Sequence, residues 1–548
     1  MTDSDYTYPR SKKTGARTRR RVLVLVAVVV LALGGVTWWV LGGLADQAAQ
    51  CTGVPARTGD GYSLDRQETD GQCVGWLTDL DFAFGSDDPV MTKAVGKIVA
   101  ENRRVAGSGQ PYVRVAVMMP MTAKPDSKLG AGPIAHALEG AYTAQIYTNG
   151  GPTPYGDPKP QIQLVLANIG NDQAAWPTVV AGLGTLTTGE HPLLAVAGMG
   201  VSVPQTRDAA KELNTRWQLP SIGSVLTADT MTTRKADGGA EKPGLFKVSP
   251  SNHAYVKSLA EALGSSATTG FLVRDRNPDD YVETLGDDFV DVFAPLSLNN
   301  HQSWFNGSTP PSTGSTALFQ EAVESISIEN PAVVFYAGRD ADFPRLVRSL
   351  KFRRGASAAR QLVIAAGVTG LVVVPGDQPG TDAAPLTTRD LADAKVTILA
   401  ASSTAPDDWA QGKSAPSQYA VFRNAFTTGA AGFPKDDLAD GYAVMHHDAV
   451  AAAVTAIRSM YAQKQALPLP ADIRDQLTGY RDKPIRGAAG EFYWSEQQPP
   501  NDLWPIGRPV PILAFPGGVP QGTVYATQCQ RLGNPGNREN YQVLDCAS

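Results

Sequence analysis

Short apolar runs alternate with longer helix-like segments along most of this chain, beginning at Val113. The clearest unit is residues 193–227, where the run LLAVAGM ends in a glycine-containing turn, a helix-like segment follows, and the apolar PSIGS returns. Continuous apolar runs of this length are typical of parallel strands that are covered on both faces. The alternation therefore predicts an α/β protein, in which ligands bind at the carboxyl ends of the strands.

The strand-like runs fall into two series. A chain of 548 residues is too long for one compact core, so we expect several domains. The two series predict two doubly wound parallel-sheet lobes, over residues 111–255 and 256–401. The polar stretch 297–316 is expected to be a loop inserted in the second lobe. The runs are 113–119, 162–168, 193–199, 220–224 and 245–249, then 270–275, 333–338, 361–367 and 395–401.

One segment near the N-terminus has the properties of a transmembrane helix. Residues 22–44 contain no charged side chain, and as a helix they would be roughly 34 Å long, enough to cross a bilayer core of about 30 Å. The basic cluster in residues 1–21 should stay in the cytoplasm. We therefore expect a single-pass anchor in the cell membrane, with the main domain extracellular. A cleaved signal peptide is the alternative, although this apolar run is longer than the usual core of such peptides.

The charge balance excludes one class of partner. The tail 1–21 carries a net charge of +5 and the whole chain −5, so the remainder carries −10. An acidic extracellular domain is a poor match for a polyanion, and we therefore expect no binding to nucleic acid.

All four cysteines follow the expected span, in an oxidising compartment where disulfides persist. Their spacing suggests two local bridges, Cys51–Cys73 within a stalk over 45–110 and Cys529–Cys546 within a C-terminal tail over 517–548. Three pairings are possible in principle. A zinc site is the competing interpretation, but neither a C-x-x-C pair nor a nearby histidine supports it. The stalk should end in an amphipathic helix that packs on the next domain.

Few residues carry a recognisable chemistry. Ser202 lies where a helix N-cap would lie, so its hydroxyl either holds an anionic group such as a carboxylate or only caps the helix. Pro204 replaces the final glycine that the nucleophile elbow of a serine hydrolase needs. Adjacent helical residues point in different directions, so His446, His447 and Asp448 should not converge on a metal ion. With no HExxH, P-loop or Rossmann motif, we expect no enzyme, no cofactor and no metal.

Four stretches together resemble a known family. They are GPIAHALEGAYTAQIYTNGG, the AGMGVS turn followed by IGSVLT, NPAVVFYAGRDADFPRLVRSL, and RGAAGEFYW. In this order they are similar to the type I periplasmic solute-binding fold, in particular to the branched-chain amino-acid binding family of ABC importers. The resemblance covers about Tyr112 to Phe515. It implies a three-strand hinge, with residues 402–467 returning to the first lobe and 468–516 to the second.

The resemblance also assigns residues to a ligand site between the lobes. In the first lobe, the groups that hold the ligand carboxylate would be Ser202, Val225 and Thr227. In the second lobe, the acidic residue that receives the ligand ammonium is replaced by Ala366, and an aromatic position is replaced by Arg339. A free amino acid would therefore lose a counter-charge there.

Three residues follow strands of the second lobe, where cleft residues belong. They are Arg339, Asp340 and Tyr281, and each is a candidate ligand contact. A solvated or lobe-bridging salt link is the alternative role for Arg339.

The resemblance implies a protein that captures a small polar ligand between two hinged lobes and delivers it to an ABC permease, and the segment 22–44 would tether this protein to the membrane. The ligand classes are amino-acid-like molecules, amides and organic acids. A receptor that reports the ligand to a membrane signalling partner is the alternative. An extracytoplasmic serine hydrolase is a remote third class, because no catalytic constellation is visible.

Overall fold

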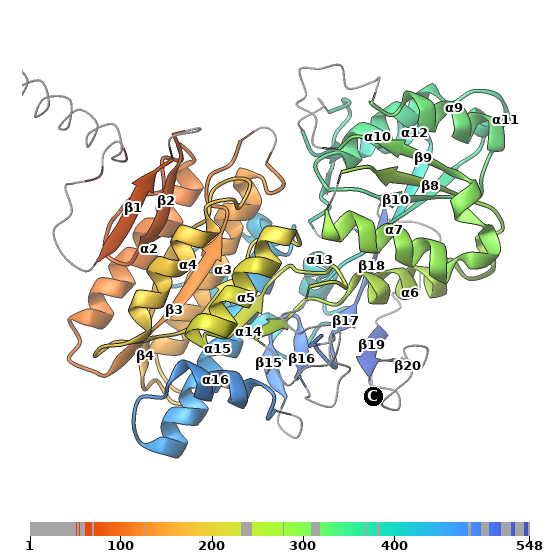
Figure 1. The fold of residues 1–548 in the computed structure, drawn as a ribbon. Helices are drawn as coiled ribbons and strands as arrows, with labels where there is room; N and C mark the ends of the chain where they lie inside the picture. Colours follow the sequence, from red (N-terminus) through yellow and green to blue (C-terminus); the bar gives the residue numbers. More distant parts are fainter. Residues whose placement is uncertain are drawn as a thin grey trace, which may run out of the picture.

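The computed structural model shows two α/β lobes side by side, joined by several chain segments (Figure 1). The prediction of an α/β fold with parallel-sheet lobes is confirmed. The structure describes residues 51, 54, 61–67, 71–124, 127–231, 244–277, 279–307, 318–367, 370–380, 384–480, 484–494 and 503–516, together with the backbone of 528–531 and 542–545.

The first lobe is built on a seven-stranded sheet of order β1-β2-β4-β3-β5-β6-β7. Its five last-named strands are parallel, and each continuous apolar run predicted for this lobe contains one of them. The strands are β1 Tyr62–Arg66, β2 Cys73–Leu77, β3 Tyr112–Met119, β4 Gln161–Asn168, β5 Leu193–Gly198, β6 Ser221–Gly223 and β7 Leu245–Lys247.

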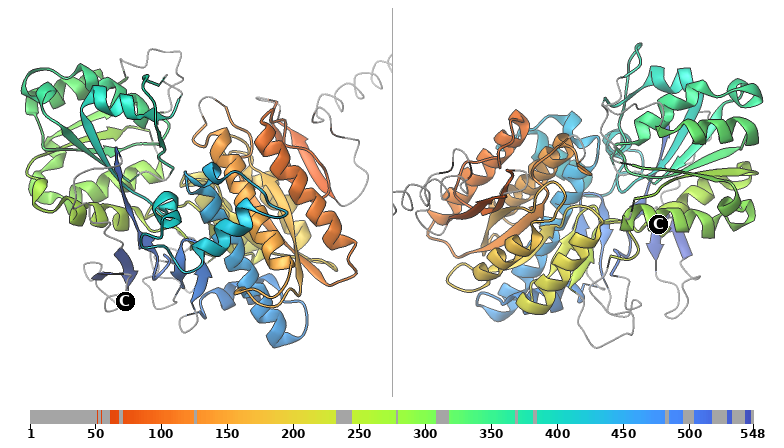
Figure 2. Two further views of the ribbon diagram at one scale, coloured as in Figure 1. Left: turned by 180° about the vertical axis from the view of Figure 1, so that it is seen from behind. Right: turned by 45° about the horizontal axis from the view of Figure 1, so that its top comes forward.

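Helices cover both faces of this sheet (Figure 2). The helices α2 Pro89–Ala106, α3 Ala131–Asn149, α14 Tyr419–Thr427 and α15 Tyr442–Lys464 pack on one face, and α4 Trp176–Gly184 and α5 Pro204–Trp217 pack on the other. Gly140 lets α3 lie very close to α15, because a Cβ at this position would meet the Ala443 carbonyl oxygen at 1.9 Å.

Residues 61–67 and 71–106 are part of the first lobe and not a separate stalk, which corrects the expectation for this part of 45–110. Strand β2 pairs antiparallel with β4, and β1 pairs antiparallel with β2. Helix α2 packs on the sheet through a buried stripe that includes Val95, Ile98 and Val99, as its apolar pattern predicted. The hairpin buries its own apolar side chains by extending the sheet edge, which a free stalk could not do.

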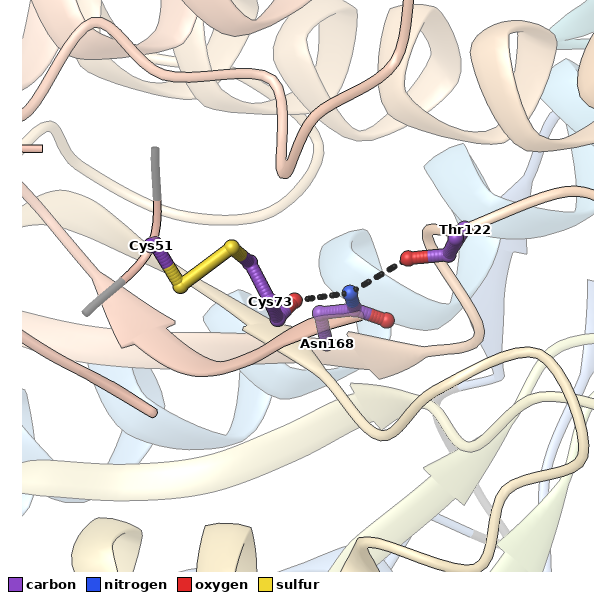
Figure 3. The surroundings of a disulfide bond; sticks show 4 residues. All are labelled: Cys51, Cys73, Thr122 and Asn168. Atoms are coloured by element: carbon purple, nitrogen blue, oxygen red, sulfur yellow. Dashed lines mark hydrogen bonds between the residues drawn. A yellow bond between two sulfur atoms is a disulfide. The ribbon is translucent and has the colours of Figure 1, made fainter. Parts of the chain in front are cut away.

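The predicted Cys51–Cys73 disulfide is present (Figure 3). It joins residue 51 to the first residue of β2, with 5.6 Å between the two Cα atoms. Beside it, the Asn168 side chain donates hydrogen bonds to the Cys73 carbonyl oxygen (2.7 Å) and to Thr122 Oγ1 (2.9 Å). The start of the described chain is thus fixed to the carboxyl end of β4.

The second lobe has a six-stranded sheet of order β18-β14-β11-β10-β8-β9. Strand β9 lies within 297–316, so the expectation of a plain inserted loop there was wrong. It pairs in parallel with β8 at the sheet edge. The strands are β8 Gly270–Asp275, β9 Gln302–Phe305, β10 Val333–Ala337, β11 Leu362–Ala366, β14 Val396–Ala401 and β18 Ile512–Phe515, with a small pair β12 Val373–Val374 and β13 Leu386–Thr387.

Helices also cover both faces of the second sheet (Figure 2). One face carries α6 Asn252–Leu263 and α7 Asp280–Val292. The other carries α9 Gln320–Glu329, α10 Phe343–Ser349 and α12 Thr388–Ala394, with the short α11 Gly355–Ala359 beside α9. One buried apolar cluster runs from α4 and α5 of the first lobe to α6 and α7 of the second, so the lobes share apolar contact as well as chain connections.

Among the described elements, the chain passes between the sheets three times. The passages lie between β7 and α6, between β14 and α13 Pro406–Ala410, and between β16 Gly490–Phe492 and β18. Helix α16 Pro470–Leu477 and the hairpin of β15 Ile485–Gly487 with β16 pack on α15, so they belong to the first lobe. The expected placement of 468–516 in the second lobe is therefore corrected, because only β18 joins that sheet.

Several expectations fall on residues outside the described part. They are the basic tail 1–21, the apolar segment 22–44 and the Cys529–Cys546 bridge. In the tail, β19 Gln528–Arg531 pairs antiparallel with β17 Pro509–Val510 and with β20 Gln542–Asp545. None of the helices in the described ranges has the length and apolar character needed to cross a membrane.

Candidate functional site between the lobes

Polar side chains from both lobes meet where the carboxyl ends of β5 and β6 face those of β8 and β10. We call this contact the seam. Parallel strands gather their carboxyl ends at one edge, so residues from distant parts of the sequence are brought together there. The seam residues are Lys128, Ser202, Arg207, Thr230 and Tyr442 from the first lobe, and Asp279, Asp280, Tyr281, Arg339 and Asp340 from the second.

Asp279 is the centre of the polar contacts in the seam. It follows β8 and caps α7, with its Oδ1 accepting a hydrogen bond from the Tyr281 amide at 3.0 Å. Its carboxylate receives two nitrogens of Arg339, Nη2 at 2.7 Å and Nε at 3.0 Å. Lys128 of the first lobe donates to Oδ2 at 2.6 Å. Asp279 thus joins a cation of its own lobe to a cation of the other.

Arg339 lies between the lobes, in the loop after β10, and is 8% exposed. Its Nη2 donates to the Ser202 carbonyl oxygen of the first lobe at 3.0 Å. Its guanidinium lies 4.7 Å from the centre of the Tyr281 ring, a distance at which a cation is attracted to an aromatic face. Among the described residues, Nη1 has no hydrogen-bond partner. Two N–H groups of Arg339 therefore stay available for an anionic guest.

Both members of the Arg339–Asp279 pair keep their charges at neutral pH. Burial alone would raise the pKa of Asp279, but the charges of Arg339 and Lys128 outweigh it and hold the pKa below its ordinary value. Burial would likewise lower the pKa of Arg339, and the Asp279 carboxylate reverses this effect.

A second ion pair crosses the seam beside the first. Arg207 of α5 donates from Nη1 to Asp280 Oδ1 at 2.5 Å, and the Thr230 hydroxyl donates to the same oxygen at 2.8 Å. The first lobe therefore presents cations, and the second lobe presents two adjacent carboxylates at the start of α7. This complementarity favours contact between the lobes.

Ser202 is not the N-cap of α5, which corrects the prediction for its hydroxyl. The cap position is Val203, and its side chain makes no capping hydrogen bond. Ser202 Oγ instead accepts hydrogen bonds from the amides of Thr227 (3.0 Å) and Ala228 (3.3 Å), while the Thr227 carbonyl oxygen accepts one from Asn252. The groups that the resemblance assigns to a ligand carboxylate are thus partly engaged within the protein. Val225 is buried in the first-lobe core.

We expect Ser202→Ala to destabilise the fold before it affects any ligand. The substitution leaves two buried amides without their acceptor, which costs about 1–3 kcal/mol in the free energy of unfolding. Urea denaturation of the full chain in detergent measures this loss. Ser251→Ala is the matched control, because it removes a serine hydroxyl that accepts a single helix-cap hydrogen bond. An unchanged midpoint in Ser202→Ala would contradict the assigned role of its hydroxyl.

Asp340 lies next to Arg339 and faces the first lobe. A Cβ built on Gly370 would lie 3.3 Å from Asp340 Oδ2 and 3.0 Å from the Tyr442 ring, so both groups border the same glycine. Burial raises the pKa of Asp340 to about 7, although the charge of Arg339 opposes the shift. Ala366 is buried at the end of β11 and offers no charge. Asp340, next to Arg339 in the sequence, is an acidic group of the second lobe without an ion pair among the described residues.

The raised pKa of Asp340 predicts a pH-dependent stability. The folded protein holds a proton that the unfolded chain releases above its ordinary pKa of 3.8, so stability falls as pH rises from about 4 to about 7. Asp340→Asn should therefore become more stable than the natural protein at pH 8 by roughly 1–2 kcal/mol after solvent screening, and not at pH 5. Thermal unfolding at both pH values, with a chelator present, measures the difference. Parallel melting curves for the two proteins would contradict this prediction.

Sequence reasoning found Arg339, Asp340 and Tyr281 but missed their partners. Asp279 and Asp280 stand in the sequence NPDD before a helix, a pattern that predicts an N-cap and acidic first turn. Nothing in the sequence links Asp279 to Lys128, 151 positions earlier, or to Arg339, 60 positions later. These pairings depend on how the two lobes meet.

In comparisons of sequence, no family model and no curated protein matches this chain. In comparisons of structure, the chain is similar to a leucine-binding protein from Thermotoga maritima, with 15% identity, 73% of this chain and 94% of that chain covered, and a TM-score of 0.46. An ABC-transporter solute-binding protein from R. palustris in complex with benzoate has 14% identity, coverage of 74% and 94%, and a TM-score of 0.49. An ABC-transporter substrate-binding protein from Desulfitobacterium hafniense in complex with Leu has 15% identity, coverage of 79% and 100%, and a TM-score of 0.49. At these identities the similarity concerns the fold alone.

Proposed function

We propose that this chain is a solute-binding protein that captures a small polar ligand at the seam between two hinged lobes. The observation that carries the proposal is the position of Arg339, whose guanidinium is held by Asp279 and touches the first lobe while Nη1 stays unpartnered. Binding would shift an equilibrium between open and closed arrangements of the lobes, as in domain closure about connecting segments.

The charges of the seam suggest the ligand class. Arg339 Nη1 offers donors for a carboxylate, and the adjacent Asp340 offers an acceptor for an ammonium or amide group. We propose that Asp340 takes the role of the acid that Ala366 replaces, so the ammonium group of an amino-acid-like ligand would still have an acidic partner. We therefore propose a small zwitterion or a carboxylate with a second polar group.

We propose that the ligand is delivered to an ABC permease from outside the cell membrane. The apolar segment 22–44 and the basic residues before it support a tethered, extracellular position for the lobes. A tether would keep the binding protein close to a membrane partner and raise its effective concentration there.

A receptor that signals to a membrane partner is the second candidate. The ion pairs Lys128–Asp279 and Arg207–Asp280 close the seam with the protein's own side chains. Because side chains of the two lobes contact each other directly, a ligand that changes these contacts could signal its presence to a membrane partner. If cells that lack this chain still take up labelled ligand, the result would favour a receptor function. If these cells lose the uptake, the result would favour a function in import.

A thermal-shift screen of the full chain in detergent tests the proposed function. The panel contains amino acids, small peptides, amides and organic acids. A ligand at 100 times its Kd should stabilise the protein by about 2.7 kcal/mol. We expect the affinity of the hit to fall at least 100-fold in Arg339→Met and about 10-fold in Arg339→Lys, which keeps the charge but not the planar donors.

Arg389→Gln is the control for this screen, because Arg389 forms only an exposed pair with Asp393 on α12 of the second lobe. The Arg389→Gln variant should bind the ligand found in the screen with the same affinity as the natural chain. Equal affinity of the hit for Arg339→Met and Arg389→Gln would refute the proposed site, and a panel without any hit would refute the proposed ligand class.

A further inference from the structure

A cluster of four titratable side chains lies in the first lobe, outside the contacts described above. His136 and Glu139 come from α3, Asp437 from the short 3-10 turn η7 Lys435–Leu438, and Asp440 from the residues before α15. One potential ligand atom from each of His136, Glu139 and Asp437 lies within 4.8 Å of the others. Residues three positions apart share one face of a helix, so His136 and Glu139 both face the turn.

Glu139 is the residue that distinguishes this cluster from other groups of charged side chains. It is 0% exposed, and in the described part of the chain no N–H or hydroxyl group donates to its carboxylate oxygens; its partner is the Asp437 carboxyl group, with which it forms a hydrogen bond only when one of the two is protonated. Asp437 Oδ2 is also buried without such a donor. Buried polar atoms are nearly always satisfied, and an unpaired buried carboxylate carries a large free-energy penalty.

His136 is oriented as a metal ligand is. Its Nδ1 lies 2.7 Å from Asp440 Oδ2, and a carboxylate acceptor there places the ring proton on Nδ1. When the ring is neutral, Nε2 is then left with a lone pair, 3.6 Å from Asp437 Oδ1. This separation is too long for a hydrogen bond, but two ligands about 2.1 Å from one tetrahedral ion lie about 3.4 Å apart.

We propose that His136 Nε2, Glu139 and Asp437 bind one divalent metal ion of the Zn²⁺ class, with water completing the coordination. An imidazole with two carboxylates suits Zn²⁺ better than Ca²⁺ or Mg²⁺, which prefer oxygen ligands alone. Asp440 is a positioning residue that holds the imidazole. His136 and Asp437 are each about one-fifth exposed, so an ion can reach the site from solvent.

The proposed ion would stabilise the first-lobe side of the seam. It would tie α3 to η7, and Asp440 also accepts a hydrogen bond from the amide of Tyr442, a seam residue at the start of α15. This role is structural and does not depend on the proposed ligand function.

Zn²⁺ titration of the full chain tests the site. The chain is purified in detergent without a polyhistidine tag, stripped with a chelator and then titrated calorimetrically. We expect one Zn²⁺ to bind to each natural chain. The affinity for Zn²⁺ should fall at least 100-fold in Glu139→Gln and Asp437→Asn, and 10- to 100-fold in Asp440→Asn. His301→Ala, which removes an exposed histidine paired with Glu329 in the second lobe, is the matched control and should bind as the natural chain does.

Thermal unfolding separates metal binding from a mere folding defect. With Zn²⁺ the natural chain should melt above Glu139→Gln, and with chelator the order should reverse, because the neutral amide removes the buried carboxylate. Failure of Zn²⁺ to bind, retention of binding in both Glu139→Gln and Asp437→Asn, or an equal loss in His301→Ala would overturn the proposal. An infrared carboxylic-acid band that persists with Zn²⁺ would show instead that Glu139 and Asp437 share a proton.

Discussion

Replacing Asp448 with alanine is expected to lower the free energy of unfolding by about 3–5 kcal/mol, because it leaves the guanidinium of Arg508 buried without its anion. Both side chains are fully buried, and Arg508 Nη2 donates to Asp448 Oδ2 at 2.6 Å. Asp448 also accepts hydrogen bonds from the amides of Ala488 (2.6 Å) and Ala489 (3.0 Å) in the turn of the β15–β16 hairpin. Urea denaturation of the full chain measures the loss.

The same pair fixes the connections between the lobes. Arg508 Nε donates to the Val248 carbonyl oxygen at 3.0 Å, so the third passage of the chain is bonded to the first. Burial alone would raise the pKa of Asp448, but Arg508 and His447 hold it below its ordinary value. The carboxylate therefore stays ionised at neutral pH, and its contribution is lost only in strong acid.

Glu491→Ala is the matched control for Asp448→Ala, because it removes an exposed ion pair with Arg486 from the same hairpin. We expect the loss of this exposed pair to lower the free energy of unfolding by less than about 1 kcal/mol. Equal losses in the two variants would contradict a special role for the buried network.

The second large effect is expected at Asp279. Asp279→Ala should cost about 3 kcal/mol, because Arg339 would remain buried and Lys128 would lose its partner across the seam. Arg339→Met alone should also destabilise. The double variant should recover part of the loss, since it removes both charges of the buried pair. A double-mutant cycle measured by thermal unfolding of four proteins gives the coupling between the two side chains.

If the losses of unfolding free energy in the two single variants add up to the loss in the double variant, the result would contradict an interaction between Asp279 and Arg339. Independent sites are additive within about 0.5 kcal/mol. The exposed pair of Arg389 and Asp393 in the same lobe provides a reference cycle with little coupling.

Most of the sheet architecture could be predicted, because burial on both faces leaves a local signal. Runs such as 193–199 and 333–338 are apolar throughout, and each contains a buried parallel strand. Strand β9 has no such signal, since it lies at an edge and its Trp304 is exposed. The hairpin β1–β2 is short and partly polar, so only its pairing with β4 shows that it belongs to the sheet.

The candidate site could be predicted in part for the same reason. Residues after strands, such as Arg339 and Tyr281, do reach the seam. The prediction for Ser202 was wrong, because serine is a preferred N-cap residue but its hydroxyl here accepts hydrogen bonds from the loop after β6. The buried pair Asp448–Arg508 joins positions 60 apart, and no local pattern marks such a contact.

The distance between the lobes in solution tests the central claim most directly. Spin labels on Lys211→Cys in α5 and Glu283→Cys in α7 place one probe at an exposed position on each side of the seam. We predict that the ligand found in the screen makes the distribution of distances between the two labels narrower and shifts it to shorter distances in the natural chain, and leaves it unchanged in Arg339→Met. If the ligand changes the distance distribution in neither protein, the result would contradict closure of the two lobes around a ligand held by Arg339.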